Sequence, residues 1–188
     1  MSRSPCTAHR QPPRHWRLRD MLSRVQLQFT LGNDANLIYV LIAYFRARLA
    51  AFDLCDATHT IRVGIALEEA LLNALFHGNL ELTSQQLALT SAELVTYGRA
   101  VSIAQRQNAF PYCSRRIQVS ADLSRTCAEF VIRDEGPGFD AAAHLPLIIE
   151  DVPQRPSSRG LELMFAFMDE VRFNDRGNEV TLIKHAAG

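Results

Sequence analysis

The sequence has no excess charge of either sign and lacks a long apolar run. Twenty lysine and arginine residues balance twenty aspartate and glutamate residues in a chain of 188 residues, so the formal net charge is zero. Such a balance gives no indication of binding to nucleic acid or to a membrane surface. We find no apolar stretch of the roughly 20 residues that a membrane-spanning helix needs. These absences favour a cytoplasmic protein with no membrane contact and no direct contact with nucleic acid.

Cysteine is scarce and scattered. The four cysteines are Cys6, Cys55, Cys113 and Cys127. No pair has the spacing of a zinc site or of a redox motif, and we expect reduced thiols, as in the cytoplasm. The length and the apolar fraction of 47% suffice for one domain with a full hydrophobic core.

The first twenty residues lack the apolar segment of a secretory signal. They hold five arginines and three prolines, with no acidic residue before Asp20. We expect residues 1–20 to form a flexible basic leader, and a basic contact arm is the alternative. No internal repeat and no linker divides the remainder, so residues 21–188 are predicted to form a single domain.

Hydrophobic periodicity predicts helices and strands in separate blocks. Helices are expected at 35–52, 61–78 and 160–169, with a helical insertion at about 83–110. Strands are expected at 25–30, 116–121, 126–133, 171–174 and 179–184. This segregation favours a two-layer α+β sandwich over a doubly wound parallel sheet. The insertion is either a partner-specific surface or a brace.

The predicted helix at 61–78 is apolar apart from one polar stripe. Glu69, Asn73 and His77 recur at i, i+4 and i+8, so they are expected to stack along one side of the helix. A carboxylate and a carboxamide among leucines and alanines are costly unless they meet a partner. A bound metal and phosphate would be one such partner.

Two further clusters flank the loop-rich segment that follows the strand at 126–133. Asp134, Gly136 and Gly138 come directly after that strand. The second cluster, which precedes the helix at 160–169, consists of Ser158, Arg159, Gly160 and Leu161. Each cluster alone is typical of a turn or a helix cap. Their order along the chain, after the polar stripe, makes the combination informative.

The three motifs together resemble the ATP-binding domain shared by DNA gyrase, heat-shock chaperones, mismatch-repair proteins and sensor histidine kinases. Residues 68–78, 133–140 and 159–171 carry the resemblance, which covers about Val25 to Lys184. The closest similarity is to the bacterial anti-sigma-factor serine kinases, of which the segment 159–171 is particularly typical. The resemblance implies a Bergerat-type fold, with a mixed, mostly antiparallel sheet covered by helices on one face.

The resemblance also implies roles in binding ATP and Mg²⁺. Asp134 would accept a hydrogen bond from the adenine amine, and Gly136 and Gly138 would let the backbone approach the base. Asn73 would help to coordinate Mg²⁺ through its carbonyl oxygen. Backbone amides around Arg159 would hold phosphates at a helix N-terminus. The other residues expected to contact the nucleotide are His77, Ser158, Gly160, Leu161 and Asn178.

Glu69 is the expected catalytic base, which would take a proton from a serine hydroxyl in a kinase or from water in an ATPase. Glu68 is the alternative, but it points about 100° away around the helix, and only Glu69 shares the face of Asn73. Residues at about 140–159 would form the ATP lid.

Two positions depart from the family pattern and leave phosphoryl transfer open. Ser158 stands where the family often has glycine, and Asn178 stands where it often has threonine. The resemblance implies a protein-serine kinase that phosphorylates an anti-sigma-factor antagonist domain and regulates transcription by partner switching. A sigma factor is the second expected partner, and a homodimer is a further candidate. The alternatives are a non-catalytic, nucleotide-dependent binding module and, less favoured, the catalytic fragment of a sensor histidine kinase.

Overall fold

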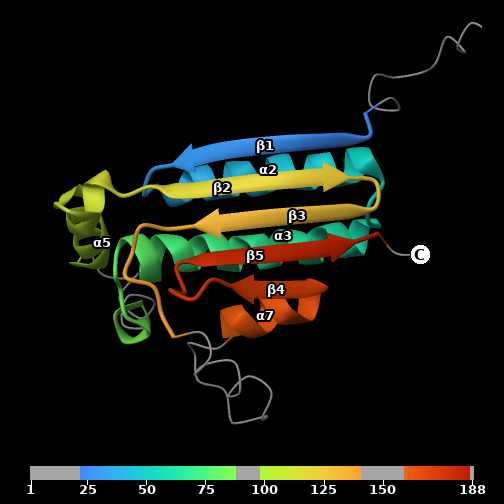
Figure 1. Cartoon of the computed structure of the whole chain (residues 1–188). Coiled ribbons are helices and arrows are strands. Elements are labelled where there is room, and N and C mark those ends of the chain that lie inside the picture. The colour runs from blue at the N-terminus through green and yellow to red at the C-terminus, as the bar shows by residue number, and fades with distance from the viewer. Residues whose placement is uncertain (1–21, 88–97, 141–158, 187–188) are drawn as a thin grey trace, which may run out of the picture.

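The computed structural model describes residues 22–87, 98–140 and 159–186, and these form two layers (Figure 1). One layer is a five-stranded sheet, and the other contains the helices α2, α3 and α7, which cover one face of that sheet. The strands are β1 (Arg24–Leu31), β2 (Ile117–Ser124), β3 (Cys127–Arg133), β4 (Glu170–Phe173) and β5 (Glu179–His185). The helices are α2 (Ala35–Phe52), α3 (Ala57–Asn73), η1 (Ala74–Asn79), α5 (Gly98–Asn108), η2 (Tyr112–Ser114) and α7 (Arg159–Phe167). The predicted α+β sandwich is confirmed.

The sheet has the strand order β1-β2-β3-β5-β4. Each neighbouring pair among the described strands is antiparallel. The prediction of a mostly antiparallel sheet is confirmed, and the parallel pair that a mixed sheet contains is not found among these strands. The register pairs Leu27 with Ala121 and Phe130 with Leu182. Because side chains alternate along a strand, one face of the sheet is apolar and packs against the helices, while the other is polar.

Helix α2 packs across the sheet through a buried apolar face. Its N-terminus is capped by the Asp34 side chain, which accepts a hydrogen bond from the backbone N–H of Asn36. Phe45 is fully buried, and its ring contacts those of Phe29 and Phe130 with centroids 5.7 and 5.1 Å apart. These edge-on contacts tie α2 to β1 and β3.

The length and apolar composition of α2 also match those of a membrane-spanning helix, which corrects the expectation that no stretch of the chain meets these criteria. The core helix of a soluble protein passes the same test. Six side chains of α2 are buried against the rest of the protein. The outward side of α2 nevertheless exposes large apolar side chains, namely Leu37, Tyr39, Val40 and Tyr44.

The polar-striped helix differs from its prediction at its C-terminal end. The α-helical part ends at Asn73, and Ala74–Asn79 form a π-helix instead of continuing the α-helix to Gly78. In this wider turn the N–H of Leu80 donates to the carbonyl of Leu75. Within this π-helical turn His77 is exposed, whereas Asn79 lies in the interior and is fully buried.

Part of the predicted helical insertion is described by the structure. α5 confirms a helix at its C-terminal end, and η2 follows. Both lie at one end of the sheet, beside the end of α3 (Figure 1). Residues 88–97 of the insertion, the leader 1–20 and residues 141–158 of the expected lid fall outside the described residues.

Candidate functional site

The first turn of α7 lies against the polar face of α3. A methyl group placed on Gly160 would lie 2.6 Å from Oε2 of Glu69 and 3.6 Å from Nδ2 of Asn73. The structure therefore contains the predicted shared face of Glu69 and Asn73. It also brings the first and third sequence clusters together, although they are distant in the chain. A side chain at position 160 would displace the Glu69 carboxylate from its present place.

The loop after β3 lies against the π-helix in the same way. A methyl group on Gly78 would lie 2.3 Å from Cγ of Asp134, and one on Gly136 would lie 2.3 Å from the carbonyl oxygen of Gly78. The first and second clusters are thus in contact through two glycines. All three clusters meet along one helix, the α3–η1 segment.

Asp134 is a buried carboxylate with one side-chain hydrogen bond. It is 8% exposed, and its Oδ1 accepts the N–H of Gly136 at 2.7 Å. Burial raises the pKa of Asp134 to about 6, against the opposing effects of the Gly136 hydrogen bond and of the charges on Arg115 and Arg176. Among the described residues no hydrogen bond reaches Oδ2. This oxygen is therefore available to a donor on a ligand.

Asn178 holds the main chain of Asp134. Its Nδ2 donates to the carbonyl oxygen of Asp134 at 2.8 Å, and the N–H of Asp134 donates to the carbonyl of Asn178 at 3.0 Å. The side chain is 3% exposed. Asn178 thus contacts the backbone of the predicted adenine-binding aspartate, and its amide is already engaged.

The turn between β4 and β5 fixes the far end of the same loop. Gly138 and Gly177 have φ angles of +80° and +72°, which side-chain-bearing residues rarely adopt. A methyl group on Gly138 would lie 1.9 Å from the carbonyl oxygen of Arg176, and one on Gly177 would lie 1.9 Å from that of Phe139. The Arg176 guanidinium also donates to the carbonyl of Gly136 at 3.0 Å. The loop is therefore held from both sides.

Glu69 is half-buried on the polar face of α3. Burial and the nearby charge of Glu68 raise its pKa, while the charge of Arg159 opposes this shift. The Asn73 side chain makes no hydrogen bond within the described part of the chain. An acid with a raised pKa beside an unengaged amide oxygen is suited to proton transfer and to a hard cation.

The remaining predicted site residues are exposed, belong to the first turn of α7, or lie outside the residues that the structure describes. His77 is exposed, and its Nδ1 lies 2.6 Å from the carbonyl oxygen of Leu82, so its role toward a nucleotide stays a prediction. Arg159 and Leu161 belong to the first turn of α7, where backbone N–H groups lack helical partners. Ser158 lies outside the described residues.

Asn79 is a site residue that the sequence analysis missed. It is completely buried, and its Oδ1 accepts the backbone N–H of Glu135, the residue after Asp134, at 2.9 Å. The available signal was an asparagine directly after the glycine that ends a predicted apolar helix. That position is normally solvent-exposed, and only the π-helical turn places it inside.

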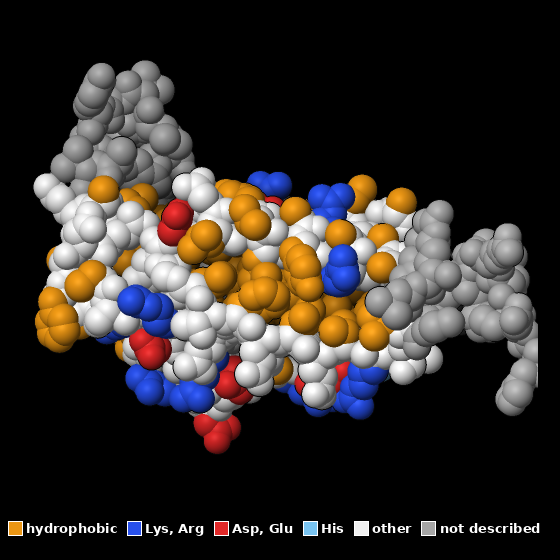
Figure 2. Space-filling model, turned by 90° about the horizontal axis from the view of Figure 1, so that it is seen from above, with side chains coloured by type: hydrophobic (Ala, Val, Ile, Leu, Met, Phe, Trp, Pro, Cys, Tyr) orange, Lys and Arg blue, Asp and Glu red, His pale blue; other side chains and the backbone are white. Residues whose placement is uncertain are grey.

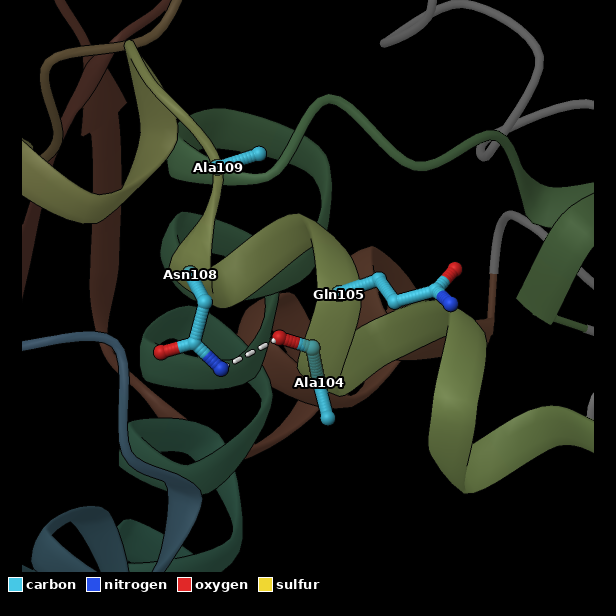
Figure 3. Close-up of a pocket in the computed structure, with 4 residues that line it drawn as sticks. All are labelled: Ala104, Gln105, Asn108 and Ala109. Carbon is cyan, nitrogen blue, oxygen red and sulfur yellow. Dashed lines mark hydrogen bonds between the residues drawn. The ribbon is translucent and has the colours of Figure 1, made fainter.

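An open hollow elsewhere on the surface does not belong to this site (Figure 3). Its lining comes from the end of α5 and the residue that follows, namely Ala104, Gln105, Asn108 and Ala109. The Asn108 amide already donates to the carbonyl of Ala104 at 2.8 Å. None of the predicted site residues lines this hollow.

The combined geometry suits a ligand with a hydrogen-bond donor at one end and negative charge at the other. The buried acceptor of Asp134 lies at the π-helical end of the α3–η1 segment, and the N-terminus of α7 lies at Glu69 and Asn73. Glycine replaces side chains at each close approach, which leaves room for backbone contact. A purine nucleotide bound to a divalent cation fits this set of donors and acceptors.

Comparison with known proteins supports the same conclusion. Residues 33–184 match the family model of the histidine kinase-like ATPase domain. No curated protein matches the sequence significantly. The matched range contains all three clusters and most of the range, about Val25 to Lys184, over which the sequence resembles ATP-binding domains.

Proposed function

Because the chain belongs to the histidine kinase-like ATPase domain family, we propose that it is an ATP-dependent protein-serine kinase of the anti-sigma-factor type. Membership of this family makes the chain a kinase-like, ATP-binding domain. The contact of Gly160 with Glu69 and Asn73 carries the proposal, because it combines an acid, an amide and a helix N-terminus in one place. These are the groups that phosphoryl transfer needs for positioning and for charge neutralisation.

The nucleotide would span the α3–η1 segment. Oδ2 of Asp134 would accept the adenine amine, and the missing side chains of Gly78 and Gly136 let the π-helix and the loop approach closely around this carboxylate. The backbone N–H groups at the start of α7 would bind phosphate oxygens. Asn73 would supply a carbonyl oxygen to Mg²⁺, which otherwise keeps waters and phosphate oxygens as ligands.

Glu69 would act as the base. It would take the proton from a serine hydroxyl of the target as the bond from that oxygen to the γ-phosphorus forms and the bond to the ADP oxygen breaks. Mg²⁺ would neutralise charge on the phosphates. Partial burial raises the pKa of Glu69, which makes the carboxylate a stronger base than an exposed one.

The target would be a serine of an anti-sigma-factor antagonist domain, and the second partner would be a sigma factor. Phosphorylation of the antagonist would free the kinase to bind sigma. The resemblance of residues 159–171 to this branch supports the assignment. The apolar outward side of α2 supports binding to a protein, and we include a second copy of the chain among the candidates (Figure 2).

A non-catalytic, nucleotide-dependent binding module is the second candidate function. The engaged amide of Asn178 favours it, because Nδ2 donates to the backbone of Asp134 and Oδ1 accepts a hydrogen bond from Asn174 in a side chain that is 3% exposed. Ser158 in place of the frequent glycine is the other departure from the kinase pattern. In this alternative the nucleotide changes partner affinity without transfer of phosphate.

Calorimetric titration with ATP, with and without Mg²⁺, tests nucleotide binding. We expect binding that is abolished by Asp134→Ala and retained by Asp122→Ala, which removes a carboxylate on the opposite face of the sheet. Absence of heat from ATP or ADP at millimolar concentration would remove the basis of both candidate functions.

Incubation of the protein and its antagonist with labelled ATP separates the two functions. A kinase labels the antagonist, Glu69→Ala lowers the rate by at least about 100-fold without loss of ATP binding, and Glu68→Ala has little effect. Binding of ATP without any labelling by the wild-type protein would favour the module.

A further inference from the structure

Asn79 is bonded on three sides at the end of the π-helix. Its Oδ1 accepts the N–H of Glu135 at 2.9 Å, and its Nδ2 donates to Oδ1 of Asn33 at 2.8 Å. Its backbone carbonyl accepts a hydrogen bond from the Arg115 guanidinium at 2.8 Å. The side chain has no solvent exposure, so each of these bonds lies where an unmade bond would be costly.

The amides of Asn79 and Asn33 form a relay with a fixed direction. The row of hydrogen bonds continues through Asn33, whose Nδ2 donates to the carbonyl oxygen of Tyr112 at 2.7 Å. At one end the N–H of Glu135 can only donate, and at the other end the carbonyl of Tyr112 can only accept. The orientation of both amides therefore follows from the two backbone groups.

This relay ends beside the buried carboxylate. Glu135 is the residue between Asp134 and Gly136, and Gly136 donates to the Asp134 carboxylate. A methyl group added to Gly78, the residue before Asn79, would collide with that carboxylate. Asn79 thus holds the loop against the helix at the point where Oδ2 of Asp134 is available.

We propose that Asn79 is a positioning residue for the purine, acting through Glu135 to hold the Asp134 carboxylate in place. This inference rests on the proposed nucleotide-binding function. Asn79 itself contacts neither the base nor the phosphates in this assignment. Its effect is on recognition of the exocyclic amine, because a loosened loop leaves Asp134 without a defined direction.

The segment containing α5 and η2 supports the relay from outside. The Gln107 amide donates to the backbone carbonyl of Asn33 at 2.6 Å. The Tyr112 ring lies under two guanidinium groups, with Arg106 4.9 Å and Arg115 5.2 Å from its centroid. In this respect the described part of the insertion acts as a brace for the purine end of the site.

Competition between two purine nucleotides tests the proposal. Inosine diphosphate carries a carbonyl oxygen where ADP carries the amine, so the ratio of the two affinities measures recognition by Asp134. We expect the wild-type protein to prefer ADP by at least about tenfold and Asn79→Ala to lower this ratio several-fold. A variant that is merely less folded weakens both affinities equally and leaves the ratio unchanged.

Asn33→Ala and Asn108→Ala complete the experiment. Asn33→Ala removes the next amide of the relay and should lower the affinity ratio less than Asn79→Ala does. If Asn79→Ala fails to fold, the ratio measured for Asn33→Ala tests the proposal. Asn108→Ala removes an exposed amide that donates to Ala104 within α5, outside the relay, and should leave the ratio unchanged (Figure 3). An unchanged ratio in the relay variants overturns the inference alone. Absence of ADP binding or of preference in the wild-type protein overturns the proposed function as well.

Discussion

At the scale of single residues, opposing contributions set the pKa of the Asp134 carboxyl group. Burial disfavours its ionised form, while the N–H of Gly136 and the charges of Arg115 and Arg176 favour it. Because the pKa is raised to about 6, the carboxylate is mostly ionised at neutral pH and protonates in mild acid. A ligand that donates a hydrogen bond to this carboxylate competes with that proton.

Nucleotide affinity should therefore depend on pH around the pKa of Asp134. We expect the affinity for ADP to be constant from pH 7 to 8 and to fall as the pH drops through about 6, since protonated Asp134 offers a weaker acceptor. Calorimetric titration at intervals between pH 5 and 8 measures this. A flat profile over that range would contradict the role of Asp134.

Asp134→Asn provides the control. With a single carbonyl oxygen, which the N–H of Gly136 already uses, the side chain presents an NH₂ group to the adenine amine, and we expect weak binding without the pH dependence.

The raised pKa of Asp134 also predicts how folding stability depends on pH, because the folded state binds more protons than the unfolded state between about pH 4 and 6. Wild-type stability should then rise as the pH falls through this interval, and the Asn variant should lack that rise.

At the scale of elements, the approach of α7 to α3 decides the geometry of the phosphate end. The first turn of α7 has no side chain at Gly160, and this brings the N-terminus of α7 close to Glu69. Helices α3 and α7 pack against each other, and Leu67 of α3 and Met164 of α7 both belong to the buried core, so the packing of the two helices fixes this approach. The site therefore depends on the distance between two helices.

Gly160→Ala should impair transfer while preserving the fold. The added methyl group would lie 2.6 Å from Oε2 of Glu69, the end of a flexible side chain, so Glu69 must move and the rate should fall by about tenfold or more. The adenine end of the site is untouched, and ADP affinity should change less than the rate. Rate assays and thermal unfolding measure the two effects.

Gly32→Ala is the matched control, because a methyl group on Gly32 meets nothing within 4 Å. We expect no change in rate or in melting temperature for this variant. If Gly160→Ala kept the full transfer rate, Glu69 would not need its present position, and its assignment as the base would be wrong.

At the scale of the whole molecule, the two exposed faces differ in character. The outer face of the sheet is polar, as shown by the contacts of Arg24 and Gln26 with Asp122. The outward side of α2 is apolar, and Figure 2 shows hydrophobic side chains gathered on the side of the molecule where α2 and β1 lie. Exposed apolar surface of this kind marks sites of association.

Val40→Asp should disrupt self-association through this face. Val40 is 68% exposed, so the substitution should leave the core intact while placing a charge at the centre of the apolar side of α2. We expect light scattering to give the mass of a dimer for the wild-type protein and of a monomer for the variant. Gln118→Asp, an exposed position on the polar sheet face, should remain dimeric. A monomeric wild-type protein would assign the face to another partner.

The sequence alone determined the elements and the family motifs. The alternation in β2 and β3 and the helical period of α2 are local patterns, and local patterns are sufficient to predict strands and helices. The shared face of Glu69 and Asn73 follows from the α-helical period for the same reason. The order of the three clusters was likewise visible in the chain and indicated an ATP-binding domain.

Tertiary structure alone decided how these parts meet. The π-helical turn that exposes His77 and buries Asn79 has no distinct sequence period, because it depends on how the end of α3 packs against the loop after β3. The raised pKa of Asp134 and the contact of Gly160 with Glu69 depend on burial and on distances between segments far apart in the chain. Periodicity reports which face of an element is buried, but it carries no information on which residue of another element lies against it.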